Sequence, residues 1–194
     1  VGGRLLNVSG VGYVPQGEYR LGEQRVAVAA ELKMLLTIAA MCNNAVLRKG
    51  GLTLGGWLRR FGRGKDKEQG NNIESLVREG FFNKIIRGFN SSDWSISGDP
   101  TEGALLVAAA KGGLWREDIE KTEARIGEIP FSSDRKRMSV ICRKGKGLCV
   151  YVKGAPDVIL DLCESIQIGE QTVPLDNVYR QLIKKENEAL AGKA

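Results

Sequence analysis

Apolar residues along this chain recur with two different periods, and the changes between them divide it into predicted helices and strands. The helical spacing is found in the segments 25–48, 101–112, 115–123, 155–163 and 177–191. The glycine pairs Gly50-Gly51 and Gly112-Gly113 follow the first two segments, which is typical of helix C-termini. Asp176 precedes the last segment, and we expect it to cap the first turn there.

An alternation of apolar and polar residues marks the expected strands. It is found in the segments 5–15, 17–21, 125–130, 136–143 and 147–153, and in two short stretches around Gly169-Glu170. Lys144-Gly145-Lys146 separates two of these segments and predicts a hairpin between them. Strands joined by short turns pair antiparallel, so the pattern predicts an α+β fold with an antiparallel β-sheet flanked by helices.

Residues 50–90 interrupt this pattern with a run that is rich in glycine and in basic residues. The run contains the basic cluster at 58–65, which is typical of a solvated loop, and a partly helical stretch at 73–90. A length of 194 residues suits one large domain or two small ones. We expect a single domain over 1–194, with a variable Gly/Lys-rich insertion at about 50–90.

Composition narrows the possible chemistry. The net charge is +6 and the pI about 9.2, so the surface attracts phosphates in general. There is no histidine, which excludes Ser-His-Asp or Cys-His catalysis and histidine-ligated zinc. No apolar run approaches the ~18–20 residues of a membrane span, so we expect no direct membrane contact. The cysteines form no C-x-x-C pair and are expected to be reduced, although Cys142 and Cys149 flank the predicted hairpin and could face each other.

The run YVKGAPDVIL at 151–160 carries the first chemical signal. A strand ending in Lys153 meets Gly154-Ala155-Pro156, and proline favours the first turn of the helix that follows. Lys153 therefore lies at a strand-to-helix turn, where a cation can meet an anionic ligand. Gly154 lets another backbone or a ligand come close, because it has no Cβ.

Two further segments turn this weak signal into a specific one: SGDPTEGALLVAAAKGG at 97–113 and IPFSSDRKRMSVICR at 129–143. In their order and spacing, the three resemble the nucleotide-binding (N) domain of P-type cation-transporting ATPases. The similarity is greatest to the type II group that contains the bacterial calcium pumps. MCNNAVL at 41–47 also resembles a helix of this family. The resemblance extends over 1–194 and is weakest in the insertion.

The resemblance implies an ATP or ADP site, and it assigns three residues to the adenine. Phe131 corresponds to the family's stacking phenylalanine, and stacking on an aromatic ring is worth ~1–3 kcal/mol per base in other systems. Glu102 is placed to accept a hydrogen bond from the exocyclic amine of adenine, whereas guanine offers a carbonyl there. Met138 is expected to pack beneath the pocket. Asp99 and Thr101 are interpreted as turn and cap residues of the helix that carries Glu102.

The same resemblance places Lys153 and Lys136 at the phosphate end of the nucleotide. Gly154 and Ala155 matter in this reading because larger side chains would crowd the purine or its ribose. Ser133 departs from the animal calcium pumps, which have an arginine there, so a guanidinium that could clamp phosphate is missing. Arg135 or Arg137 could compensate, and strand alternation alone does not decide which of them faces the site.

Motifs of the parent pumps are absent from this sequence, notably D-K-T-G-T and T-G-E-S. We therefore expect a cytoplasmic domain of an integral bacterial plasma-membrane protein, with no catalytic residue and no metal ligand of its own. Its expected partners are the phosphorylation and actuator domains. ATP, with Mg²⁺ in the full-length pump, would pass its γ-phosphate to an aspartate outside this chain. The isolated chain should be almost inactive as an enzyme.

Three other interpretations of this sequence compete with the N domain of a calcium pump. The first is the N domain of another type II pump, which moves Na⁺/K⁺, H⁺ or Mg²⁺; it stays an alternative because the membrane helices determine which ion is transported. A heavy-metal pump does not fit, because those pumps rely on a His-Pro pair that this sequence lacks. A basic nucleic-acid-binding module fits the charge but has no helix-turn-helix, zinc or paired-aromatic signature, so we expect no nucleic-acid partner. A P-loop enzyme is excluded because G-x-x-x-x-G-K-[ST] does not occur.

Overall fold

The computed structural model describes residues 1–50 and 94–192. Residues 51–90 of the expected insertion, with the basic cluster at 58–65 and the stretch at 73–90, lie outside the described residues. Within the described part of the chain, no helix combines the length and the apolar character that crossing a bilayer requires.

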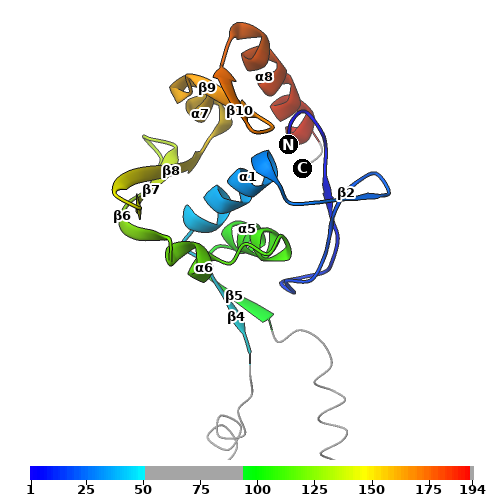
Figure 1. Cartoon of the computed structure of the whole chain (residues 1–194), viewed down its shortest axis with the longest axis vertical. Coiled ribbons are helices and arrows are strands. Elements are labelled where there is room, and N and C mark those ends of the chain that lie inside the picture. Colours follow the sequence, from blue (N-terminus) through cyan, green and yellow to red (C-terminus); the bar gives the residue numbers. More distant parts are fainter. Residues whose placement is uncertain (51–93, 193–194) are drawn as a thin grey trace, which may run out of the picture.

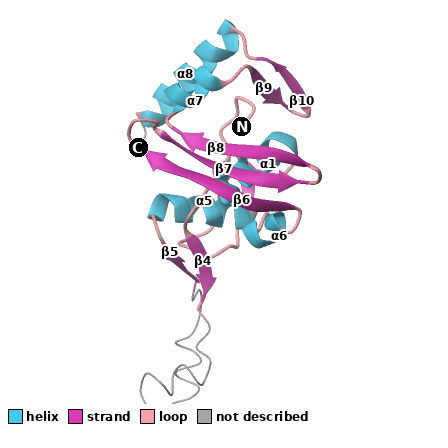
Figure 2. Ribbon diagram, turned by 90° about the vertical axis from the view of Figure 1, so that its left-hand side faces the viewer, coloured by secondary structure: helices cyan, strands magenta, loops and turns pink. Residues whose placement is uncertain are grey.

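An antiparallel sheet of three strands covers one side of the described part of the molecule and faces the viewer in Figure 2. Its strands are β6 (Glu123–Ser132), β7 (Arg137–Lys144) and β8 (Gly147–Gly154), in that order. Lys144 pairs with Gly147, so the turn between β7 and β8 has two residues, and Gly145 there has a φ of +59°. Glycine adopts this left-handed conformation without steric cost. The predicted hairpin is confirmed.

Two helices, α1 (Ala30–Met41) and α5 (Pro100–Lys111), pack against each other beside the sheet (Figure 1). The predicted span of 101–112 for α5 is confirmed to within one residue. Asp99 caps α5, because its Oδ1 accepts hydrogen bonds from the backbone N–H groups of Thr101 (2.8 Å) and Glu102 (3.0 Å). These bonds favour the carboxylate and lower the pKa of Asp99.

The first predicted helix is wrong at both ends. Arg25 and Val26 belong to β3 (Gln24–Val26), and helix α1 begins only at Ala30. Residues 25–48 were expected to be helical, but α1 ends at Met41, and β4 (Val46–Lys49) pairs with β5 (Trp94–Ser97). The cause is Asn43, whose Nδ2 donates to the carbonyl of Ala39 (3.1 Å) and whose Oδ1 accepts from the N–H of Ala45 (2.9 Å). Such local side-chain bonds compete with the backbone bonds of a helix.

The described core has two clusters. One lies between α1 and α5 and contains these buried residues: Tyr19, Leu32, Leu36, Ala40, Ala45, Leu106 and Ala109. The other joins the end of α1 to one face of β7 and β8 and contains these: Met41, Cys42, Met138, Val140, Cys142 and Tyr151. Truncating one large side chain in such a core costs about 2–5 kcal/mol. The second cluster therefore fixes the sheet against the helix.

The N-terminal strands are more divided than the sequence predicts. Instead of two strands there are three short ones, β1 (Asn7–Val8), β2 (Tyr19–Leu21) and β3 (Gln24–Val26). Tyr19 attaches them to α5, because its hydroxyl donates to the carbonyl of Ala108 (2.5 Å). Burial disfavours the charged phenolate and raises the pKa of Tyr19 to about 12.

The remaining predicted elements are confirmed as α6 (Arg116–Glu120), α7 (Pro156–Leu162), β9 (Ser165–Ile168), β10 (Gln171–Pro174) and α8 (Asn177–Ala191). Asp176 caps α8 as expected, through its Oδ1 and the N–H of Tyr179 (3.0 Å). The α+β class is also confirmed, with five helices among the described residues. Instead of one flanked sheet, the described strands form four separate antiparallel sheets.

Candidate functional site

Three predicted site residues lie side by side across the three-stranded sheet β6–β7–β8. Met138 on β7 pairs directly with Lys153 on β8. On its other side, the register jumps from Ile129–Ser139 to Ser132–Arg137, so Pro130 and Phe131 together stand opposite the single residue Met138. This is the arrangement of a β-bulge, which redirects a side chain. Phe131 is 63% exposed, whereas Met138 is buried in the second core cluster.

The ammonium group of Lys153 meets a carboxylate from another element. Its Nζ lies 2.9 Å from Oε1 of Glu102, in the first turn of α5, and both side chains are mostly buried. The structure thus brings Glu102 to the row formed by Phe131, Met138 and Lys153. The position of Lys153 at the phosphate end of the nucleotide stays a prediction, and in this geometry its ammonium group is paired with the Glu102 carboxylate.

The second oxygen of Glu102 is also bound. The backbone N–H of Asn44 donates to Oε2 (2.9 Å). Burial opposes ionisation of Glu102, but the hydrogen bonds from Lys153 and from the Asn44 N–H outweigh it, and the pKa of Glu102 is lowered. A carboxylate has about four acceptor positions, so both oxygens retain capacity for a further donor. The site thus contains a fixed anionic hydrogen-bond acceptor.

Asn43 and Asn44, in the turn after α1, are site residues that sequence reasoning missed. Asn43 is fully buried, and its Nδ2 donates to the backbone carbonyl of Glu102 (2.8 Å) as well as to Ala39. The side chain of Asn44 accepts from Arg125 and donates to Glu128. The adjacent asparagines in MCNNAVL were a usable signal, because side-chain amides favour turns over helix interiors.

Gly154 and Ala155 close the turn where β8 leaves the sheet. The N–H of Ala155 donates to the carbonyl of Lys136 (2.9 Å). A Cβ on Gly154 would stand 2.5 Å from Cβ of Arg137 and closer still to the carbonyl oxygen of Lys136. Glycine is therefore needed because another backbone passes close by. The crowding of a purine or ribose by a larger side chain stays a separate prediction.

Lys136 itself is exposed on the turn between β6 and β7 and has a φ of +50°. Ser133 is exposed on the same turn. Arg135 reaches back across the hairpin, donating to the carbonyl of Pro130 (3.3 Å) and to Oγ of Ser139 (3.2 Å). Ser139 alternates with buried Met138 along β7, so Arg135 lies on the face of the sheet opposite to Lys153. Arg137 follows the same alternation and donates to the carbonyl of Arg135 (3.1 Å).

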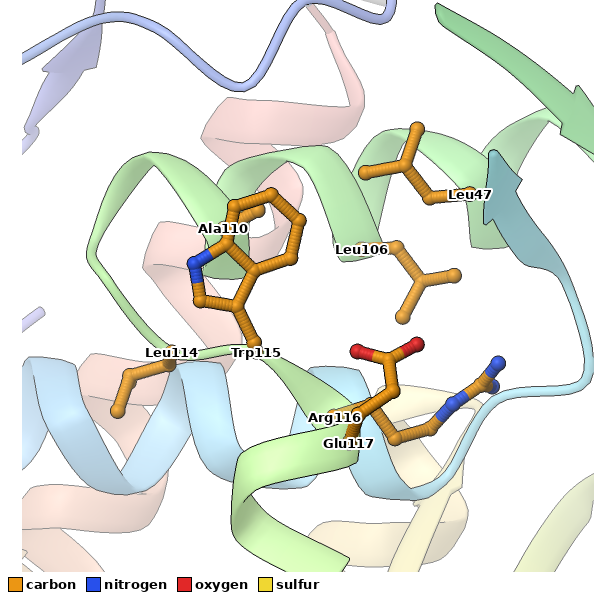
Figure 3. A pocket seen from close by; sticks show the side chains of 7 residues that line it. All are labelled: Leu47, Leu106, Ala110, Leu114, Trp115, Arg116 and Glu117. Carbon is orange, nitrogen blue, oxygen red and sulfur yellow. The ribbon is translucent and has the colours of Figure 1, made fainter. Parts of the chain in front are cut away.

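Two hollows accompany these elements. The larger, about 450 Å³, is mainly apolar and lies between α1, β8 and α7, where it reaches Lys153 and Gly154. The smaller, about 140 Å³, lies on the other side of α5 (Figure 3). In Figure 3, Trp115 and Glu117 project from the start of α6 toward Leu106 and Ala110 of α5. Among the described residues, no group of three or more His, Cys, Asp or Glu side chains is placed to hold a metal ion.

Comparison with known proteins defines the class of this fold and site. The family described as "P-type ATPase, cytoplasmic domain N" matches residues 72–194, which is more than half of the chain. The chain therefore belongs to this family, and the resemblance carried by the three motifs is confirmed.

Individual relatives support the same assignment. The chain is 33% identical over 162 residues to "Calcium-transporting ATPase" of Bacillus subtilis, which covers 82% of this chain and 14% of that protein. It is 30% identical over 183 residues to "Cation-transporting ATPase pma1" of Synechocystis, which covers 90% of this chain and 16% of that protein. It is 36% identical over 104 residues to "Sodium/potassium exporting P-type ATPase cta3" of Schizosaccharomyces pombe, which covers 53% of this chain and 10% of that protein. The chain thus spans about one-sixth or less of these relatives.

Proposed function

We propose that this chain binds ATP for a P-type cation pump, with the adenine between Phe131 and the carboxylate of Glu102. The observation that carries the proposal is Glu102, held as an anion by Lys153 and by the Asn44 N–H. Lys153 lies in the same row across the sheet as the exposed Phe131. The exocyclic amine of adenine donates hydrogen bonds, so a fixed carboxylate favours it. Guanine presents a carbonyl there, and two acceptors repel each other.

Each site residue has a role in this proposal. Phe131 stacks on the purine, a contact worth ~1–3 kcal/mol in other systems. Met138 supports the floor of the pocket from the core. Lys153 keeps Glu102 ionised and oriented. Lys136, on the exposed turn, attracts the phosphates, and Gly154 and Ala155 form the turn that holds its backbone in place.

The contribution of the domain is positioning. In the parent pump, the bound ATP would be carried to an aspartate of the phosphorylation domain, and domain closure would complete the site for γ-phosphate transfer. Mg²⁺ would arrive with the phosphates as part of the substrate. The actuator domain would be a further partner. We infer that the chain is a single domain with an insertion at about 50–90, and that it lies on the cytoplasmic side of a bacterial plasma membrane.

Calcium is the transported ion that we propose. Support comes from "Calcium-transporting ATPase" of Bacillus subtilis and "Calcium-transporting ATPase 1" of Lactococcus lactis, which is 32% identical over 104 residues. The similarity to a sodium/potassium exporter of Schizosaccharomyces pombe favours a second candidate, another type II pump. Ion transport by the complete pump would separate the two.

A titration of the chain with ATP, ADP, AMP and GTP, followed by heteronuclear NMR, tests the nucleotide site. We expect Kd values of roughly 0.1–10 mM, equivalent to ~3–5 kcal/mol, with ATP preferred to GTP. Phe131→Ala should weaken binding, whereas Leu148→Ala, which truncates a similarly exposed apolar residue at the far end of β8, should not. Equal binding of ATP by both variants would contradict the stacking role.

A further inference from the structure

Arg125 makes three side-chain hydrogen bonds near the site, and none of its described bonds is to Glu102 or Lys153. Its Nη1 donates to the carbonyl of Asn43 (3.0 Å), and its Nη2 donates to Oδ1 of Asn44 (2.8 Å). The same Nη2 lies 2.5 Å from Oε2 of Glu128, and about a fifth to a quarter of each of these two charged side chains is exposed. One guanidinium therefore holds two consecutive residues of the turn after α1.

A bulge in β6 makes this arrangement possible. Residues three apart in a regular strand point to opposite faces. Here the register passes from Arg125–Cys142 to Gly127–Ile141, so Ile126 is an extra residue. The insertion returns Glu128 to the side of Arg125, and Glu128 Oε1 accepts a bond from Nδ2 of Asn44 (2.8 Å). Asn44 is thus held at both polar atoms of its side chain.

The turn formed by Asn43 and Asn44 also holds Glu102. The N–H of Asn44 donates to Oε2 of Glu102 (2.9 Å), and Nδ2 of Asn43 donates to the backbone carbonyl of Glu102 (2.8 Å). A continuous series of hydrogen bonds therefore runs from Arg125 through Asn44 to the carboxylate. Lys153 binds the other oxygen of that carboxylate.

We propose that Arg125 is a positioning residue for base selectivity, acting through Asn43 and Asn44 on the carboxylate of Glu102 without touching the nucleotide. The inference rests on the proposed adenine site. Without this guanidinium, the Asn43 carbonyl keeps only the bond from Nη1 of Arg116 (3.2 Å), and the Asn44 side chain keeps only its bond to Glu128. The peptide between Asn43 and Asn44 is then held less firmly, so the Asn44 N–H orients Oε2 of Glu102 less well. Lys153 still attracts the carboxylate, so Glu102 stays charged but is less well oriented. Discrimination between adenine and guanine should fall, whereas attraction of the phosphates should not.

The test compares Kd values for ATP and GTP in the wild-type chain, Glu102→Gln, Arg125→Gln and Arg125→Lys. Arg125→Gln should reduce the ATP/GTP preference by roughly 3–10-fold, within the range of coupling between contacting residues, with the Kd for GTP changed less than about twofold. Lysine keeps the charge but not the planar fork, so Arg125→Lys should recover only part of the preference. Arg143→Gln removes an exposed cation from β7 and serves as the control.

The double variant Glu102→Gln/Arg125→Gln separates positioning from general destabilisation. If Arg125 acts through Glu102, the double variant discriminates no worse than Glu102→Gln alone. Additive losses, or a folded Arg125→Gln with the wild-type preference, would overturn the inference. If Arg125→Gln does not fold, the test rests on Arg125→Lys. An ATP/GTP preference of Arg125→Lys equal to that of the wild type would also overturn the inference. If Glu102→Gln itself keeps the full preference for ATP, the proposed adenine site fails, which is a different result.

Discussion

Gly154→Ala provides a sharp test of the packing at the end of β8. An ideal Cβ at this position would stand 2.5 Å from Cβ of Arg137 and 2.8 Å from its Cα, and closer still to the carbonyl oxygen of Lys136. Real Cβ contacts are essentially never shorter than 3.0 Å. The atoms that must give way are mainly backbone, so the strand and the turn have to separate.

The expected cost has two parts. Overpacking of a tight site typically destabilises by ~1–3 kcal/mol, and weakening the hydrogen bond from Ala155 to Lys136 adds ~0.5–1.5 kcal/mol. Together these give a loss of ~2–4 kcal/mol in the free energy of unfolding, equivalent to about 5–15 °C in Tm for a chain of this size. Urea unfolding and calorimetry measure both quantities.

Gly147→Ala is the matched control at the other end of the same strand. Its added Cβ would meet only the carbonyl oxygen of Lys144, at 3.8 Å, which is ordinary contact. This variant should be neutral or slightly stabilising, because alanine restricts the unfolded chain. If Gly154→Ala were as stable as Gly147→Ala but bound ATP poorly, the backbone argument would be refuted and crowding of the nucleotide would be the better explanation.

The remaining predictions concern titration and thiol chemistry. The pKa of Glu102 is lowered in the folded chain, so its contribution to stability is present above the unfolded pKa of about 4.3 and is lost as the pH falls through the folded pKa. The difference in the free energy of unfolding between wild type and Glu102→Gln should therefore shrink on acidification. A difference that stays constant with pH in urea unfolding would contradict this. Burial raises the pKa of the Cys42 and Cys142 thiols, whereas Cys149 and Cys163 are half-buried. An aromatic disulfide reagent should therefore label Cys149 and Cys163 first. Labelling of Cys142 at the same rate as Cys149 would contradict this and would show that the sheet opens.

Local signals in the sequence predicted the elements whose causes are local. The β7–β8 hairpin follows from alternation on both sides of a glycine turn, and α5 follows from an Asp-Pro start and an alanine-rich run. Helix α8 likewise begins after the predicted Asp176 cap. The sequence did not predict the end of α1, because the buried side chain of Asn43 makes hydrogen bonds that take the place of helical backbone bonds. The spacing of apolar residues carries no information about such side-chain bonds.

The site could be predicted only in part, since its residues come together through tertiary contacts. The resemblance named Glu102 and Lys153, but their pairing joins α5 to β8 across 51 residues, and no local pattern indicates it. The proximity of Arg125 to Glu128 depends on a bulge at Ile126 that regular alternation would not predict. The side of the hairpin occupied by Arg135 likewise required the register of β7 against β8.

The most direct test of the adenine site is the measurement of intermolecular nuclear Overhauser effects between the adenine protons of ATP and the side chains of this chain. The proposed site predicts contacts from the adenine H2 and H8 protons to the ring of Phe131 and to the methyl group of Met138. Contacts confined to residues elsewhere, for example to Trp115 beside the smaller hollow, would contradict the proposed position of the base.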